Sequence, residues 1–366
     1  MEQIRLIRPN ITFKEIEQDF REIFEDGIFT KGKFLCRLEC NLKKEIKSKY
    51  VHLVSSATVG LWLTLKFLNI GKGDSVIVSD YSYPATVNVI EDLGAIPIFA
   101  EVNQATYNLD VSKLKEEDLK KARALIFVDT FGNPSGLDEV GKICEEYGVP
   151  LIEDAACALG STLNSVPCGG GSTYSCFSFH PRKIITGGEG GTIATKSEQF
   201  SAWLQTKLAQ GARAVNNKIV FEDYGYKFSL TELQAAMVDK QLKKISETIR
   251  ARQAIKTKYI EELHSLGMIP QEITKNSEHN VQSVVFTLPK HINRDSLIGE
   301  LRSKGIETTI GTYCLSMCKY YKEKYRVDNK VSRWLEEKSI TLPCYEGIDI
   351  DKVISKIKSS GLWSEQ

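Results

Sequence analysis

Between residues 50 and 200, short apolar runs alternate with helix-like segments, and this alternation constrains the fold more than any other feature of the chain. Strands that are apolar throughout, separated by amphipathic helices, are typical of a mostly parallel sheet that is covered on both faces. We therefore predict an α/β fold, with strands at 51–54, 75–79, 95–100, 124–129, 149–154, 174–179 and from 192, and helices at 58–68, 85–93 and 137–147.

Acidic residues stand at the ends of three of these predicted strands, namely Asp80, Asp129 and Asp154. In a parallel sheet, ligands bind at the carboxyl ends of the strands. The sequence therefore predicts that a site is assembled at that edge of the sheet.

The pattern changes after residue 230. The stretch TELQAAMVDKQLKKISETIRARQAIKTKYIEEL predicts one helix of about nine turns, at 3.6 residues per turn. A strand at 281–289, a helix at 294–305 and further alternation near 334–360 indicate a compact α+β unit. A helix this long commonly bridges two domains, so we place a boundary near residue 246. The expected domains are a large one, 1–246, and a small one, 247–366.

The segment 174–195, YSCFSFHPRKIITGGEGGTIAT, carries the strongest chemical signal. Its first strand stops at His180-Pro181, because proline supplies no N–H and restricts the residue before it. Lys183 follows, and then four glycines surround Glu189. A lysine at a strand end, beside a glycine-rich segment that a ligand can approach closely, is where a Schiff-base lysine is expected. The alternative is a solvated loop lysine, one of 48 Lys and Arg residues.

Three other segments carry weaker signals. The turn Ser55–Thr58 opens a helix whose free N–H groups could bind phosphate, although ordinary N-capping is as common. Tyr83, just past a strand end, could stack on a planar ring or pack in the core. Asp154, followed by small residues, is costly to bury without a partner. A protonated pyridine nitrogen would be such a partner, and a capping or salt-bridged aspartate is the alternative.

A phosphate cradle, a stacking aromatic, a strand-end aspartate and a lysine, in that order, are the parts that pyridoxal 5′-phosphate requires. The glycines at 187–191 could instead be a nucleotide-phosphate cradle. That alternative ranks last, because the GxxxxGK[ST] order is missing.

Composition excludes several other classes of protein. The formal net charge is +1, from 48 basic and 47 acidic side chains, which gives no indication of a nucleic-acid or membrane-surface partner. The nine cysteines include no CxxC pair, and the five histidines form no cluster with metal-ligand spacing, so no metal is expected. Reduced thiols, and the lack of an apolar run of roughly 20 residues, predict a soluble cytoplasmic protein.

The chain resembles the DegT/StrS group of nucleotide-sugar aminotransferases, which are fold-type I enzymes dependent on pyridoxal phosphate. The resemblance runs from about residue 32 to residue 357. Its most specific part is the lysine segment, which is CFSFHPRKIITGGEGGTIAT here. The other matching segments are SSATVGLWLTLKFL, GDSVIVSDYSYPATVNVI, YNLD, IEDAACALG, GYKFSLTELQAAM and LPCYEGI.

The resemblance implies a role for each matching residue. Lys183 would hold the cofactor as a Schiff base and then shuttle a proton between cofactor and substrate. Asp154 would pair with the pyridine nitrogen, and Tyr83 would stack on the ring. The family works as a dimer with each active site at the interface, so GYKFSL would reach the partner's cofactor. The expected phosphate contacts are Ala57, Thr58 and Ser178.

This chain departs from the family pattern at three positions. Cys157 replaces the usual glutamine near the cofactor ring, and it is a poorer hydrogen-bond donor. Lys227 and Ser229 replace the usual asparagine and arginine, although Lys227 could still bind a phosphate as a point charge.

One branch of the family has histidine in place of the lysine and dehydrates its sugar, and Lys183 argues against that branch. His180 and Tyr313 are candidate substrate contacts, with structural roles equally open.

The implied reaction transfers an amine from a donor, expected to be L-glutamate, to a keto group of a nucleotide-linked deoxysugar. Surface polysaccharide or glycoconjugate synthesis is the family's usual setting. Two alternatives stay open. One is a regulatory protein that binds the cofactor without turnover, which the unusual residues at 157, 227 and 229 allow. The other is a lyase acting on an amino acid, which would need an arginine for the α-carboxylate that the sequence does not locate.

Overall fold

The computed structural model describes residues 3–216 and 218–364. Its centre is a seven-stranded sheet with strand order β1-β10-β9-β6-β5-β2-β4. β10 runs antiparallel to both of its neighbours, while β9, β6, β5, β2 and β4 are mutually parallel. This confirms the mostly parallel sheet. The strands are β1 (Tyr50–Val54), β2 (Ser75–Ser79), β4 (Ile96–Ala100), β5 (Ala122–Val128), β6 (Leu151–Asp154), β9 (Tyr174–Ser178) and β10 (Gly191–Thr195).

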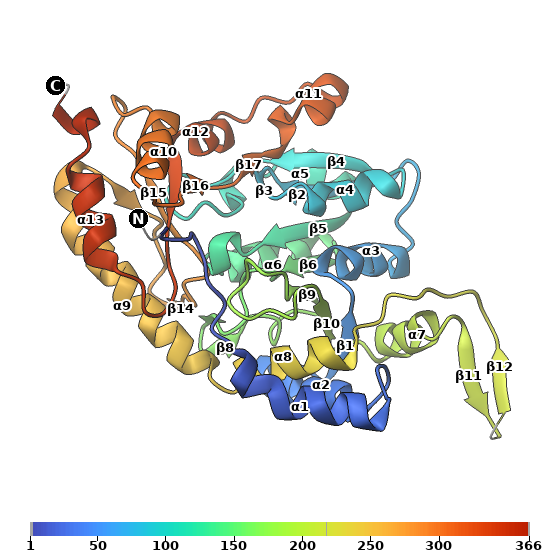
Figure 1. Cartoon of the computed structure of the whole chain (residues 1–366). Helices are drawn as coiled ribbons and strands as arrows, with labels where there is room; N and C mark the ends of the chain where they lie inside the picture. The colour runs from blue at the N-terminus through green and yellow to red at the C-terminus, as the bar shows by residue number, and fades with distance from the viewer. Residues whose placement is uncertain (1–2, 217, 365–366) are drawn as a thin grey trace.

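Helices cover both faces of this sheet, as Figure 1 shows. One face packs against α3 (Ala57–Phe67), α4 (Ala85–Asp92) and α7 (Glu198–Leu208). The other face packs against α5 (Glu116–Lys121), α6 (Leu137–Tyr147), α2 (Lys33–Ile46) and α8 (Glu232–Leu242). Because both faces are buried, the strands are mainly apolar, which is the pattern that the sequence displayed.

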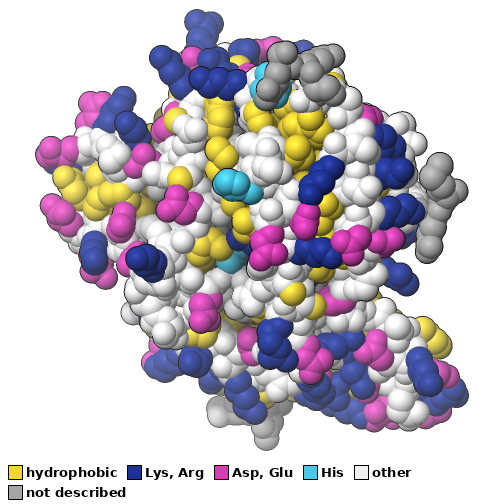
Figure 2. Space-filling view, turned by 90° about the vertical axis from the view of Figure 1, so that its left-hand side faces the viewer, with side chains coloured by type: hydrophobic (Ala, Val, Ile, Leu, Met, Phe, Trp, Pro, Cys, Tyr) yellow, Lys and Arg dark blue, Asp and Glu magenta, His cyan; other side chains and the backbone are white. Residues whose placement is uncertain are grey.

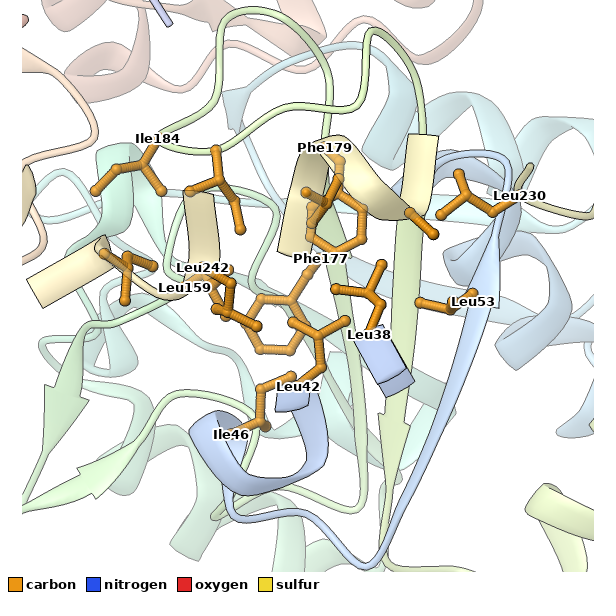
Figure 3. Packing of buried hydrophobic residues seen from close by; sticks show 14 of the residues in the cluster. Leu38, Leu42, Ile46, Leu53, Leu159, Phe177, Phe179, Ile184, Leu230 and Leu242 are labelled. Carbon is orange, nitrogen blue, oxygen red and sulfur yellow. The ribbon is translucent and has the colours of Figure 1, made fainter. Parts of the chain in front are cut away.

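One apolar cluster lies directly beneath the loop that carries Lys183. Phe177 and Phe179, which are 1% and 0% exposed, pack against Leu38 and Leu42 of α2 (Figure 3). Ile184, next to Lys183, is buried in the same cluster. Burial of a large apolar side chain stabilises a fold by about 1.5–3 kcal/mol. The buried side chains of Phe177, Phe179 and Ile184, which flank the loop in the sequence, therefore anchor it to the core.

The C-terminal part forms a second, antiparallel sheet with strand order β13-β15-β18-β16. It packs against α9 (Ile245–Leu263), α10 (Arg294–Ser303) and α13 (Ile350–Lys358), and Ile4 from the start of the chain joins the same core. This confirms the expected α+β unit, whereas the boundary at residue 246 stays a prediction. The strands are β13 (Ile269–Pro270), β15 (Val284–Thr287), β18 (Ser339–Leu342) and β16 (Thr309–Ile310).

The single long helix predicted after residue 230 is wrong, because α8 ends at Leu242 and α9 begins at Ile245. Lys244 between them has φ −115° and ψ 15°. Its Nζ atom is bound by Glu15, at 2.6 Å, and by Asn10, at 3.2 Å. No glycine or proline marks this break. Contacts with the N-terminal segment accompany it, and a helical pattern does not reveal such contacts.

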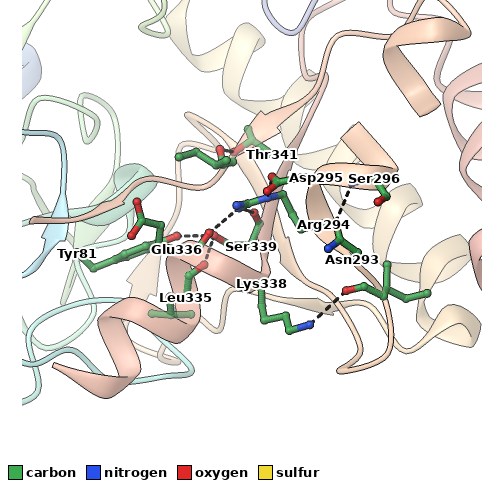
Figure 4. Close-up of polar contacts among 12 residues, drawn as sticks. Tyr81, Asn293, Arg294, Asp295, Ser296, Leu335, Glu336, Lys338, Ser339 and Thr341 are labelled. Carbon is green, nitrogen blue, oxygen red and sulfur yellow. Dashed lines mark hydrogen bonds and ion pairs between the residues drawn. The ribbon is translucent and has the colours of Figure 1, made fainter. Parts of the chain in front are cut away.

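Contacts join the segment that follows β2 to the C-terminal unit. The hydroxyl of Tyr81, in β3 (Tyr81–Ser82), lies 2.6 Å from Ser339 Oγ (Figure 4). Arg294 Nη1 donates to Ser339 O at 3.1 Å. β3 also pairs with β17 (Tyr313–Cys314). The segment that leads to Tyr83 is therefore fixed to both units.

Two surface features bear on partners. A hairpin of β11 (Ala212–Val215) and β12 (Lys218–Phe221) projects from the body, at the right of Figure 1. The face in Figure 2 carries basic and acidic side chains interspersed, in line with the balanced net charge. In the described residues, no helix combines the length and the apolar character needed to cross a membrane.

Candidate active site

Lys183 lies on the tight turn that follows β9. Its backbone N–H donates to His180 O at 2.8 Å, which closes the turn, and its side chain is half-buried. Its Nζ atom lies 3.0 Å from Cys157 Sγ. Among the described residues, no carboxylate oxygen lies within 4 Å of this amine. The amine is therefore held near the strand ends without an ion-pair partner.

Asp154 is the last residue of β6 and is only 5% exposed. Thr86 Oγ1 donates to its Oδ2 atom at 2.8 Å, and the N–H of Ala156 donates to Oδ1 at 3.2 Å. Burial raises the pKa of Asp154, while the Thr86 hydrogen bond and the charge of Lys183 act in the opposite direction. A cationic group at this carboxylate would favour its ionised form further.

A cradle of backbone and small side chains forms where β1 leads into α3. Ser56 caps the helix by accepting from Val59 N at 3.2 Å, and Ala57 is the first helical residue. Gly191 pairs with Ser178 in the neighbouring strand. A Cβ atom at Gly191 would lie 2.6 Å from Ala57 N, so only glycine permits this approach. The free N–H groups of the first turn of α3 suit an anion such as phosphate.

The other residues expected at the site are more exposed. Tyr83 is 66% exposed, and its ring centroid lies 6.3 Å from that of Tyr313, which is 39% exposed. His180 is half-buried, with Nε2 4.0 Å from a Glu189 carboxylate oxygen, and burial lowers its pKa. Thr58, on the first turn of α3, is exposed as well.

Lys227 is exposed, in the segment that runs beside the cradle. The neighbouring Phe228 O accepts from Ser55 N at 2.9 Å. The GYKFSL segment therefore touches the cradle of its own chain. Whether Lys227 also reaches the cofactor of a partner stays a prediction.

Of the three strand-end aspartates, Asp154 is the one whose pKa the charge of Lys183 lowers. Asp80 accepts from Ser316 N and Ser316 Oγ, both at 2.6 Å, and so ties the C-terminal unit to β2. Asp129 is fully buried, and burial together with nearby Glu153 raises its pKa well above the ordinary value. Asp129, Glu153 and Cys168 carry potential metal-ligand atoms within 4.8 Å of one another. Burial raises the pKa of both Asp129 and Glu153, which favours a protonated carboxyl group at this pair.

Residues 10–358 match the sequence profile of the DegT/DnrJ/EryC1/StrS aminotransferase family. The chain belongs to this family. An uncharacterized protein of Methanocaldococcus jannaschii is 31% identical over 96% of this chain and 95% of its own. A GDP-perosamine synthase of Vibrio cholerae is 30% identical over 89% of each chain.

The fold is the one found in solved DegT/DnrJ/EryC1/StrS-type structures. A putative sugar aminotransferase of Streptococcus pneumoniae, in its PLP form, has a TM-score of 0.92 at 24% identity, covering 99% of each chain. This confirms the fold-type I architecture. As a member of this family, the protein is an aminotransferase that depends on pyridoxal phosphate.

The residues present in this aminotransferase fit that cofactor. Lys183 offers an amine without an ion-pair partner, and Asp154 offers a buried carboxylate whose remaining partner can be a ring nitrogen. The first turn of α3, against which Gly191 packs closely, would hold the phosphate through its backbone amides. Cys157, next to Lys183, would lie beside the ring.

Sequence reasoning missed the residues that support this site. Thr86 lies in a segment that the sequence singled out, but its contact with Asp154 joins α4 to β6 and has no local signal. Asn280 Nδ2 donates to Cys157 O at 2.8 Å, and Gln282 Oε1 accepts from Ile184 N at 2.8 Å. Both come from the C-terminal half of the chain, so only the tertiary structure brings them to the lysine loop.

Proposed function

We propose that the protein transfers an amino group from L-glutamate to the keto group of a nucleotide-linked deoxysugar. The observation that carries this proposal is the amine of Lys183, held at the same sheet edge as the buried Asp154 carboxylate and without an ion-pair partner. The sugar class is supported by relatives named GDP-perosamine synthase in Vibrio cholerae and in Escherichia coli O157:H7.

The residues would divide the work as follows. When bound, pyridoxal phosphate supplies the electron sink that amine transfer needs. Asp154 would hold the ring nitrogen, and Tyr83 would stack on the ring. Lys183 Nζ would take a proton from the substrate carbon that bears the amine and deliver it to the carbon of the cofactor, first as a general base and then as a general acid. The contacts for the phosphate are Ala57, Thr58 and Ser178.

The absorption spectrum of the purified protein tests this proposal. Adding L-glutamate to the wild type should bleach the visible cofactor band, and a keto-sugar nucleotide should restore it. Lys183→Ala should show neither change. A wild-type band that stays constant with glutamate, and with other amino acids, would contradict an aminotransferase acting by this route.

Two alternatives make different predictions. A regulatory protein that only binds the cofactor would keep its biological activity in Lys183→Ala, whereas a catalyst would lose it. A lyase would release product from an amino acid without any sugar nucleotide. The identity of residue 183 favours the transferase over the regulatory protein.

We further propose a homodimer with shared active sites. The β11–β12 hairpin exposes Ile219 by 73% and Phe221 by 71%, and apolar side chains on a projecting hairpin suit burial by a second copy. Mixing two inactive variants tests the sharing. Lys183→Ala protomers combined with Lys227→Ala protomers should regain transfer, because one site of each mixed dimer then contains both intact residues. Failure to regain any transfer in confirmed mixed dimers would contradict sharing through Lys227.

The proposed setting is cytoplasmic synthesis of a surface polysaccharide or glycoconjugate. All nine cysteines are free thiols, as suits a reducing compartment. Fractionation of the native cells, followed by a search for amino sugars in their surface glycans, would test both parts.

A further inference from the structure

A hollow of about 430 Å³ lies between the loop that carries Lys183 and the C-terminal unit. Arg182 borders it from the lysine loop, and Arg302 borders it from the last turn of α10. Gln3 and Leu6, from the start of the chain, complete the wall. Three segments that are distant in the sequence therefore meet around this space.

The two arginines are the first sign of a binding site. Both side chains are exposed, and neither lies within 4 Å of a carboxylate oxygen in the described part of the chain. Guanidinium groups present a planar fork of donors that matches phosphate and carboxylate oxygens. Two such forks on one hollow, both unpaired, provide the donors for an oxyanion.

A buried hydroxyl in the same wall is an independent second sign. Thr308 is 5% exposed, and its Oγ1 atom has no hydrogen-bond partner in the described structure. A buried polar group left without a partner costs about 1–3 kcal/mol. A ligand oxygen in the hollow would remove this cost.

The hollow also contains an acid, which narrows the class of ligand. Glu307 accepts from Gln3 Nε2 at 2.8 Å and from Leu6 N at 3.0 Å, so it anchors the N-terminal segment. The negative charge of Glu307 disfavours binding of a small anion that has no hydrogen-bond donors. The carboxylate can accept further hydrogen bonds, so it favours a ligand that offers hydroxyl donors beside its anionic oxygens.

We propose that this hollow binds the diphosphate of the sugar nucleotide, with Arg182 and Arg302 on the phosphate oxygens. This proposal rests on the function proposed above and specifies where that substrate is held. A nucleotide sugar carries both diphosphate oxygens and sugar hydroxyls, which suits the arginines together with Glu307. Glutamate shares the oxyanion but has no hydroxyl group. Arg182 is adjacent to Lys183 in the sequence, so the hollow lies beside the loop that carries the reacting amine.

Binding of nucleoside diphosphates to the holoenzyme tests the site directly. Calorimetry with GDP, UDP and dTDP should find one that binds, and Arg182→Gln and Arg302→Gln should each weaken it roughly tenfold to a hundredfold. Arg123→Gln is the matched control. Arg123 is exposed, lies near the start of β5 and is not among the residues that line the hollow. Equal affinity in all four proteins would overturn the proposal, as would the absence of binding by every diphosphate.

The glutamate half-reaction separates this proposal from the proposed function. Bleaching by glutamate should require the same glutamate concentration in the wild type and in the Arg182→Gln/Arg302→Gln double variant, while the KM for the keto-sugar nucleotide rises. A higher glutamate requirement with unchanged diphosphate affinity would assign the hollow to the amino donor and overturn the diphosphate site. If no amino acid bleaches the wild type, the proposed function fails, and diphosphate binding still decides whether the hollow takes that ligand.

Discussion

The Nζ atom of Lys183 lies 3.0 Å from the Sγ atom of Cys157. A thiol is a weak hydrogen-bond partner for an amine, so it restrains the lysine less than an amide or a carboxylate would. The geometry therefore leaves the amine available for covalent and proton-transfer chemistry.

Replacing Lys183 tests this role. Lys183→Ala should lower the transfer rate by roughly a thousandfold or more, because the group that moves the proton is lost. Its melting temperature should stay close to that of the wild type, since Lys183 is only half-buried. The matched control is Lys196→Ala, whose exposed amine donates to Gly171 O at 2.7 Å. Retained turnover in Lys183→Ala would contradict the assignment.

Thr86 is expected to position Asp154. Thr86→Val keeps the shape but removes the donor to Oδ2, and hydrogen bonds to charged groups contribute about 1.5–3 kcal/mol. We expect the affinity for pyridoxal phosphate, measured by reconstitution of the apoenzyme, to fall roughly tenfold. Thr86→Ser retains the hydroxyl and should restore most of it. If valine and serine behave alike, the hydrogen bond does not position the carboxylate.

Gly191 offers a steric test of the cradle. A Cβ atom there would lie 2.6 Å from Ala57 N and 2.7 Å from Phe177 O, so the backbone itself must move. Gly191→Ala should lower the free energy of unfolding by about 1–3 kcal/mol and weaken cofactor binding, as overpacking does. At Gly171, the one neighbour within 4 Å of an added Cβ is Val166 Cγ1, at 3.9 Å, so Gly171→Ala is the control. Equal denaturation midpoints would contradict the tight approach.

Asp80 predicts a specific pH dependence of stability. Burial raises its pKa to about 6 in the folded protein, against 3.8 for an ordinary aspartate. Between these values the folded state binds more protons than the unfolded state, so the free energy of unfolding falls as pH rises from about 4 to 6.

This contribution amounts to about 3 kcal/mol. Asp80→Asn lacks the titrating group, so the stability of the wild type relative to this variant should decrease by about that amount from pH 4 to pH 7. Urea denaturation across this range measures it. A constant difference between the two proteins would show that Asp80 does not titrate there.

The sequence predicted the large sheet well because both faces of its strands are buried and their apolar runs are unmistakable. The observed β2 is Ser75–Ser79, as expected, and α6 is Leu137–Tyr147, as expected. The break between α8 and α9 escaped prediction because side-chain contacts with Glu15 and Asn10 accompany it. The residue pattern around the break does not indicate contacts with residues so distant in the sequence.

Within the candidate site, prediction succeeded for side chains at strand ends and failed for their supports. Asp154 and Lys183 follow strands that the sequence displays, so topology alone brings them to one edge. Thr86 and Gln282 reach that edge from a helix and from the C-terminal unit. Their positions depend on how whole elements pack, which a single sequence does not encode in any short motif.

The pairing of β1 with β10 sets an order of events during synthesis. Val54 pairs with Gly191, and β10 is the neighbour of β1 in the sheet. While the ribosome extends the chain beyond Val54, the backbone N–H and C=O groups of β1 that later bond to β10 have no strand partner until residue 191 emerges. Closing so long a loop is slow, and an unpaired strand edge is prone to aggregation. We therefore expect nascent chains that end between β1 and β10 to depend on chaperones and to acquire cofactor binding only once the strand after the glycine-rich loop is in place.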